Sequence, residues 1–170
     1  MKTPMTVAQS LRHARHDFLN ELQLIKMNLD LGRLDEVQAI IRTHGEAAVQ
    51  MSRLSGLKME KLEEWLLLSQ WRYPEFRFHL SCQAVKAPVH LDGLYAETIE
   101  ALIEAALEGT DPYEEYECFL TFSNEDSYFI AEIRLTGEWT EITVPETELE
   151  IVKACGPDGL NIAIRAQMEG

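Results

Sequence analysis

The feature that most constrains the fold of this sequence is the spacing of apolar residues in its first third. From residue 7 to residue 31 they recur at intervals of seven, four, three and four positions, at Leu11, Phe18, Leu22, Ile25 and Leu29. This spacing is typical of one face of a helix and differs from the alternation of a strand. No proline occurs between Thr6 and Leu68. We therefore predict a long helix over residues 7–31.

A second helical segment follows after a two-residue interruption. Gly32 and Arg33 break the apolar pattern, which resumes at Leu34 and continues past a weak point at residues 55–56 to Leu66. Glycine at position 32 suits a helix C-cap and a tight reversal, so we expect two antiparallel helices. A lone hairpin cannot bury both apolar faces, whereas two hairpins related by a twofold axis enclose a core. We therefore expect a homodimeric four-helix bundle.

The composition changes near residue 72, beyond which five of the six prolines lie. We predict a helical domain over residues 1–70 and a mixed domain over residues 71–170. In the second domain, period-two and helical spacings predict a strand at 76–84, a helix at 95–108, strands at 118–122 and 128–135, a short acidic helix at 146–154 and a strand at 160–167. The expected fold class is α+β: the helical hairpin plus an α/β sandwich with its helices on one face of the sheet.

Charge and cysteine content exclude several function classes. The 170 residues include 15 Lys and Arg against 29 Asp and Glu, a net charge of -14, which disfavours binding to nucleic acids and anionic membranes. The three cysteines are scattered, which argues against a zinc site or a disulfide framework and fits a reduced cytosol. Apolar runs are far shorter than the roughly 20 residues that cross a bilayer, and residues 1–10 lack a signal-peptide core. We expect a cytoplasmic protein.

One histidine of the first helix is placed away from the apolar face. At about 100° per residue, Arg12, Asn20, Gln23 and Met27 lie within roughly 40° of His16, whereas the apolar residues lie on the opposite side of the helix. His16 is therefore expected to point to solvent.

The residue types around His16 make phosphoryl transfer chemically possible. A largely neutral imidazole has a ring nitrogen able to attack phosphorus. Arg12 could steady a phosphoryl group, Asn20 could orient a hydrogen bond and Asp17 could fix the ring tautomer, although Asp17 could instead pair with His13. From geometry alone, an exposed histidine without a role remains the simpler interpretation.

The segment from Arg12 to Leu29, with its core Arg-His-Asp-x-x-Asn-x-Leu-Gln, resembles the phosphoacceptor helix of the sporulation initiation phosphotransferase B family. It is also similar to the dimerisation helix of citrate-type sensor histidine kinases. The resemblance implies that His16 accepts a phosphoryl group from the aspartyl-phosphate of one response regulator and passes it to an aspartate of a second, in the initiation of sporulation. It also implies that no cofactor is held by this chain, since the regulator carries Mg²⁺.

With this role for His16, its neighbours are assigned roles from their chemistry and their place on the helix. Arg12, Asp17 and Asn20 would assist the transfer, and a contact surface for the regulators would include Arg15, Gln23, Lys26 and Met27. From the residues alone, Arg15 could equally pair across the bundle, and Lys26 could merely be solvated. His44, His79 and His90 have no metal-ligand neighbours at suitable spacing, and we interpret them as structural.

The second domain discriminates between a phosphotransferase and a kinase. Aligning residues 101–108 with the nucleotide-binding helix of sensor kinases puts Ala105 where a magnesium-binding asparagine should stand. No Asp-x-Gly-x-Gly box occurs, and the Gly156-Pro157-Asp158-Gly159 segment resembles a phosphate-binding loop only weakly. The resemblance thus implies a degenerate kinase ATPase domain. Two alternatives stay open: a sensor kinase with a divergent ATP site, and a non-enzymatic dimeric adaptor.

Overall fold

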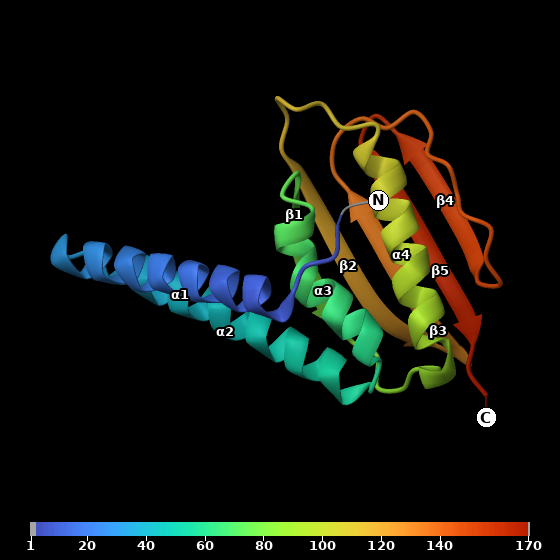
Figure 1. Cartoon of the computed structure of the whole chain (residues 1–170), viewed down its shortest axis with the longest axis horizontal. Coiled ribbons are helices and arrows are strands. Elements are labelled where there is room, and N and C mark those ends of the chain that lie inside the picture. The colour runs from blue at the N-terminus through green and yellow to red at the C-terminus, as the bar shows by residue number, and fades with distance from the viewer. Residues whose placement is uncertain (1–2, 170) are drawn as a thin grey trace. The chain divides into compact units, whose positions relative to one another are not determined.

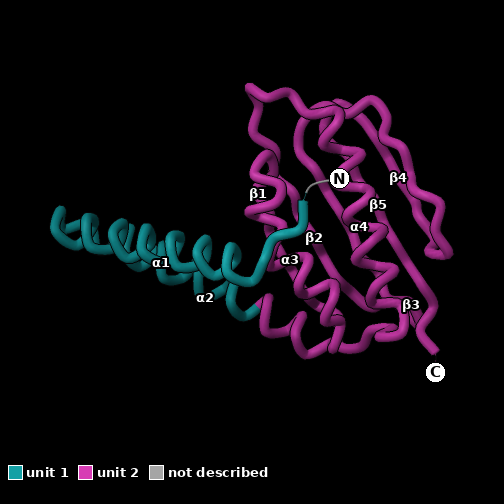
Figure 2. Tube along the Cα trace, viewed as in Figure 1, with its two compact units in different colours: residues 1–49 teal, residues 50–170 magenta. Residues whose placement is uncertain are grey.

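The computed structural model describes residues 3–169 and divides into two compact units, Met1–Val49 and Gln50–Gly170 (Figure 2). The boundary expected from composition was residue 70. Residues 50–70 instead belong to the second unit, because Leu54, Met59 and Leu62 are completely buried in its core.

The first unit contains the predicted helical hairpin. Helix α1 (Val7–Asp30) begins with a capping box, in which the Thr6 hydroxyl accepts from the Gln9 amide and the Gln9 side chain accepts from the Thr6 amide. Gly32, at φ +70°, reverses the chain into helix α2 (Leu34–Gly56). That conformation favours glycine because it has no Cβ. The two helices run side by side (Figure 1).

The second helical segment is divided rather than continuous. Helix α2 ends at Gly56, and helix α3 spans Glu60–Arg72. Lys58 adopts a left-handed conformation, at φ +61°, which no α-helix can contain. The first amides of α3 are satisfied by the carboxylate of Asp92, whose oxygens accept from the backbone nitrogens of Lys61 at 2.8 Å and Leu62 at 2.9 Å.

A five-stranded sheet forms the body of the second unit (Figure 1). Its order is β1 (Phe76–Cys82), β2 (Tyr116–Glu125), β3 (Tyr128–Leu135), β5 (Gly159–Gln167) and β4 (Glu150–Gly156). Strand β1 is parallel to β2, and all other neighbours are antiparallel. The connection from β1 to β2 contains a short 3₁₀ turn, η1 (Val89–Leu91), and helix α4 (Asp92–Leu107).

Helices α3 and α4 cover one face of this sheet (Figure 1). The side chains that point toward them alternate along each strand and form the core, for example Cys118, Leu120 and Phe122 of β2. The opposite face carries polar and charged residues such as Arg77, Glu132 and Arg165. The predicted α+β fold class, with helices on one face of the sheet, is confirmed.

The acidic helix predicted at 146–154 is wrong, because residues 150–154 belong to strand β4 and residues 146–149 precede it without regular secondary structure. Glutamates at positions 146, 148 and 150 alternate with Thr147, Leu149 and Ile151, which is the period of a strand. Residues 156–159 form a tight turn that pairs β4 with β5, and such a hairpin supplies every residue of β4 with a partner. The observed order is therefore β-α-β-β-β-β, not β-α-β-β-α-β.

Two further expectations concern thiols and membranes. All three cysteines are free, and burial raises the pKa of the Cys82 and Cys118 thiols. Among residues 3–169, no helix combines the length and the apolar character that spanning a membrane requires.

The Asp92 cap predicts a measurable contribution to stability. Asp92→Ala leaves two amides of α3 without their acceptor and should lower the free energy of unfolding by about 1 kcal/mol. Asp92→Asn, which keeps one acceptor oxygen, should lose less. Chemical denaturation of the two variants checks this, and equal losses would contradict the capping role.

The ion pair between β4 and β5 predicts that the free energy of unfolding depends on pH. Arg165 donates to both oxygens of Glu150, at 2.7 and 2.6 Å, and these hydrogen bonds lower the pKa of Glu150. The stabilisation is therefore complete above the unfolded-state pKa of about 4.3 and disappears as the pH falls through the lower folded-state value. Glu150→Gln should lower the urea midpoint at pH 7 and leave it unchanged at the acid end of that window. Glu148→Gln, which removes the same charge nearby, should have little effect at either pH.

Candidate functional site

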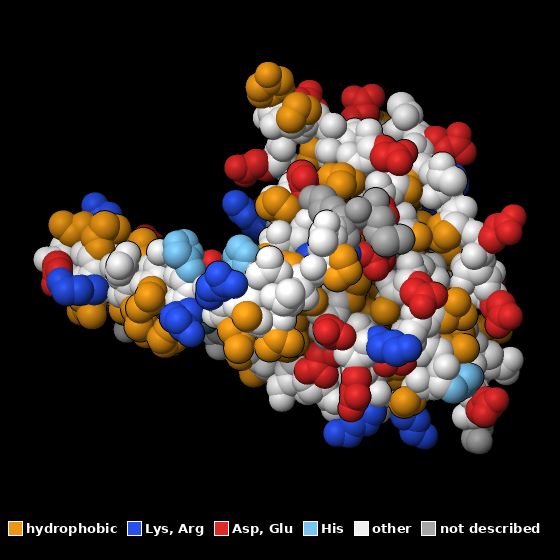
Figure 3. All heavy atoms as spheres, in the orientation of Figure 1, with side chains coloured by type: hydrophobic (Ala, Val, Ile, Leu, Met, Phe, Trp, Pro, Cys, Tyr) orange, Lys and Arg blue, Asp and Glu red, His pale blue; other side chains and the backbone are white. Residues whose placement is uncertain are grey.

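His16 lies in the middle of α1 with its side chain 75% exposed. The exposure that the helical wheel predicts is thus observed. Figure 3 shows histidine side chains next to Lys and Arg side chains on the surface of the helical unit. An exposed imidazole on a regular helix can be approached by a partner protein without any change of conformation.

Two neighbours on α1 contact the same ring nitrogen of His16. The amide nitrogen Nδ2 of Asn20 lies 3.2 Å from Nδ1, and an Asp17 carboxylate oxygen lies 3.7 Å from it. With the amide nitrogen facing the ring, Nδ1 accepts from Asn20; in the other tautomer a proton on Nδ1 faces the Asp17 carboxylate. Both neighbours lie on the Nδ1 side of the ring. The arrangement therefore leaves Nε2 as the nitrogen open to a partner.

The other predicted site residues lie on the same helix but are not gathered around the imidazole. The guanidinium Nε of Arg12 donates to its own helix at the Ala8 carbonyl, 3.3 Å away. Lys26 pairs with Asp30 at 2.7 Å. Arg15, Gln23 and Met27 are exposed. The structure thus brings Asp17 and Asn20 to His16, whereas the remaining five residues line the same exposed helix.

A stripe of exposed apolar side chains runs along the hairpin. On α1 it includes Phe18, which is 62% exposed, and on α2 it includes Leu34, which is 60% exposed; the other members are Leu11, Leu22, Leu29, Ile41 and Val49. We call these seven residues the apolar stripe. Its α1 members lie across the helix from His16. So much exposed apolar surface on a small helical unit is characteristic of a protein interface.

Two exposed apolar side chains that the sequence analysis did not single out lie close to His16 along α1. Leu19 and Leu24 are exposed apolar residues outside the apolar stripe, within one to two turns of the histidine. Their place on the helical wheel could have revealed them, because they flank the face of His16 and lie apart from the apolar stripe. In addition, the ring of His44 on α2 lies 2.9 Å from the Glu21 carboxylate on α1, a pairing between helices that one-dimensional spacing does not reveal.

In the second unit, the segments compared with kinase nucleotide motifs have ordinary structural roles. Ala105 is half-buried and packs against the core below α4. Gly156 and Gly159 are a cross-strand pair that closes the β4–β5 hairpin, so this segment is a turn and not a phosphate loop. Across residues 3–169, no three His, Cys, Asp or Glu side chains are grouped so as to hold a metal ion.

A family model matches the helical region of the chain. The family model described as "Sensor_kinase_SpoOB-type, alpha-helical domain" matches residues 2–57. Sporulation initiation phosphotransferase B of Bacillus subtilis (strain 168) is 42% identical over 62 residues, which cover 36% of this chain and 32% of that protein. The match therefore spans about a third of the relative's length. These two findings confirm the resemblance inferred from residues 12–29.

Among solved structures, the chain is similar to a crystal structure of the histidine kinase ThkA in complex with the response regulator protein TrrA. The superposition has a TM-score of 0.48 at 10% sequence identity and covers 94% of this chain and 61% of that chain.

Proposed function

We propose that the protein is a histidine phosphotransferase of a phosphorelay, which moves a phosphoryl group from the aspartyl-phosphate of one response regulator, through His16, to an aspartate of a second. The observation that carries the proposal is the exposed His16 imidazole, with one nitrogen held by its neighbours and the other open to solvent. The 42% identity over 62 residues to a sporulation phosphotransferase supports this reaction and a role in the initiation of sporulation.

The chemistry requires little from this chain beyond a well-placed nucleophile. The Nε2 lone pair of His16 attacks phosphorus in line; the N–P bond forms, the bond from phosphorus to the aspartyl oxygen breaks, and the carboxylate leaves with its electron pair. The Asp17 carboxylate stabilises the positive charge that develops on the ring, and Asn20 orients the ring through Nδ1. The regulator supplies Mg²⁺ to neutralise the phosphoryl oxygens, so this chain needs no cofactor. The reverse geometry then loads the second regulator.

The distribution of charge favours the first unit as the place where an acidic regulator pocket docks. Residues 1–49 contain six Lys and Arg and six Asp and Glu, whereas residues 50–170 contain nine against 23. All of the net charge of -14 is therefore carried by the second unit. A pocket that contains an aspartyl-phosphate is repelled by that unit but not by the electrically neutral hairpin, where Arg12 and Arg15 attract it.

The regulator contact surface would extend along α1 from His16. Gln23, Lys26 and Met27 follow it within three turns, and the exposed side chains of Leu19 and Leu24 add apolar area on its flanks. Protein interfaces of this kind combine an apolar centre with polar residues at the rim.

The apolar stripe is proposed to pair two copies of the hairpin. Because its α1 residues lie across the helix from His16, a four-helix bundle would cover the stripe and leave each histidine accessible. A homodimer with two outward histidines is consistent with this arrangement of the faces.

The central prediction concerns the fate of labelled phosphate. A regulator phosphorylated with ³²P should label this protein, and the label should then pass to a second regulator. His16→Gln should abolish the acid-labile, base-stable phosphate. Label acquired from ATP alone, without a regulator, would indicate a sensor kinase, and normal signalling by His16→Gln would indicate an adaptor.

A pair of variants separates the two faces of α1. Leu22→Asp places an unpaired charge in the apolar stripe and should convert the dimer to a monomer in analytical ultracentrifugation. Gln23→Asp adds the same charge one residue away, outside the stripe, and should leave the dimer intact. Asn20→Ala should also remain dimeric but transfer phosphate about tenfold more slowly, because a hydrogen bond to the ring is lost. Equal dissociation of all three would contradict the assignment of the faces.

A further inference from the structure

The face of the sheet that the helices leave uncovered contains a hollow of about 330 Å³. Its side chains belong to two neighbouring rungs, a rung being a row of residues in register across β2, β3 and β5. One rung is Phe119, Arg134 and Asn161, and the other is Thr121, Glu132 and Ala163. Residues in register point to the same face, opposite core residues such as Leu120 and Ile133. The volume lies at the lower end of the range of small-molecule sites.

The hollow has an apolar side made of small residues. Ala163 contributes to its lining on β5, and strand β4 continues the two rungs with Val152 and Ala154. Val152 is 55% exposed, and Ala154 is exposed as well. A small apolar group that covers these side chains removes their surface from water, which is favourable.

On the other side of the hollow, Arg134 is positioned by an aromatic ring. Its guanidinium lies over Phe119, with Cζ 4.2 Å from the ring centroid. The His79 ring stacks on Phe119 with the centroids 4.8 Å apart, and comes from β1, whereas Arg134 comes from β3. A guanidinium that stacks through its plane keeps the N–H groups at its edge available to a ligand.

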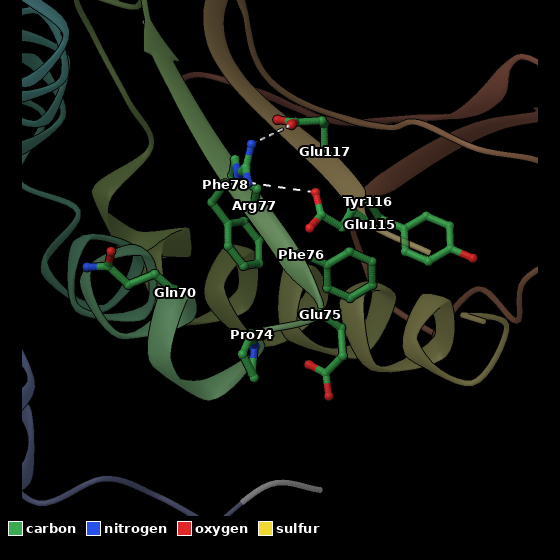
Figure 4. A pocket seen from close by; sticks show the side chains of 9 residues that line it. All are labelled: Gln70, Pro74, Glu75, Phe76, Arg77, Phe78, Glu115, Tyr116 and Glu117. Carbon is green, nitrogen blue, oxygen red and sulfur yellow. Dashed lines mark hydrogen bonds and ion pairs between the residues drawn. The ribbon is translucent and has the colours of Figure 1, made fainter. Parts of the chain in front are cut away.

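The two charged residues of the hollow have no ion-pair partner in the described part of the chain. There, no carboxylate oxygen lies within 4.0 Å of a nitrogen of Arg134, and no cationic nitrogen lies within 4.0 Å of the Glu132 carboxylate. A hollow where β1 and β2 begin differs in this respect, because its Arg77 pairs with Glu115 and Glu117 (Figure 4). Opposite charges that do not pair with each other leave room for a ligand between them.

The charges and the apolar side together select a class of ligand. Residues 132 and 134 are about 6.7 Å apart along β3, so two groups of one small molecule can reach both. A carboxylate is suited to accept from Arg134 and from the Asn161 amide, and an ammonium group is suited to donate to Glu132. A molecule with both groups has no net charge, so the strongly acidic second unit does not repel it.

We propose that this hollow binds a free α-amino acid with a short branched apolar side chain, such as leucine. Arg134 binds its carboxylate, Glu132 binds its ammonium group, and its side chain lies over Ala163. The interaction is separate from phosphoryl transfer at His16 and gives the second unit a ligand of its own. A terminal residue of a peptide has only one of the two charged groups on its α-carbon and binds more weakly.

The first test compares ligands on the full chain. Titration with L-leucine should produce saturable shifts in ¹H–¹⁵N correlation spectra at the residues of the two rungs. N-acetyl-leucine, which lacks the ammonium group, and leucine amide, which lacks the carboxylate, should each bind about tenfold more weakly because one charged contact is lost. Equal binding of either derivative and leucine, or no saturable shifts with leucine, would overturn the proposal.

The second test fills the hollow without changing any charge. Ala163→Leu places a branched side chain in the hollow and should abolish the leucine-dependent shifts. Gln167→Leu adds the same side chain to the same face of β5, outside the hollow, and should leave binding unchanged. Both positions face away from the core, and the spectra without ligand report whether each variant is folded. Leucine binding by Ala163→Leu as tight as by Gln167→Leu would contradict the site.

The third test removes each charge next to a matched control. Arg134→Gln should weaken leucine binding about tenfold, whereas Lys86→Gln, which removes an exposed positive charge from the loop after β1, should change it less than about twofold. Glu132→Gln and Glu146→Gln form the corresponding pair for the ammonium group. Equal effects within either pair would show that only the overall charge matters and would contradict the assigned contacts.

Discussion

The functional interpretation depends on the periodicity of one helix. With 3.6 residues per turn, the sequence of α1 sends its apolar residues to one side and His16 to the other. Under the proposed function, this 24-residue element would supply both an association surface and an open nucleophile without a cleft. A shift of one residue in the apolar pattern would rotate the stripe by about 100° and bring it toward the histidine.

The second unit is strongly acidic, whereas the first has no net charge, and a distant carboxylate satisfies the first amides of one of its helices. Its excess of carboxylates disfavours an unassisted polyphosphate ligand by repulsion, and two amides at the start of α3 are already satisfied by Asp92. The start of α3 and the glycine turn at residues 156–159 are both occupied by groups of the chain itself.

The sequence predicted the elements whose pattern is local and regular. Helix α1, its reversal at Gly32 and strand β3 were predicted closely, because apolar spacing and glycine placement determine them within a few residues. The break between α2 and α3 depends on Lys58 and on the distant Asp92, and strand β4 depends on pairing with β5; both need partners far along the chain. At the candidate site, the exposure of His16 was predictable from the wheel, whereas the pairing of His44 with Glu21 required the arrangement of the hairpin.

The most direct measurement of the central claim is the position of the phosphoryl group on the protein after brief exposure to a phosphorylated regulator. Long-range ¹H–¹⁵N NMR of the histidine rings distinguishes both the residue and the nitrogen that is modified. The account predicts a single phosphohistidine, at Nε2 of His16, since Nδ1 faces Asn20 and Asp17. Phosphate on another histidine, or on Nδ1 of His16, would contradict it.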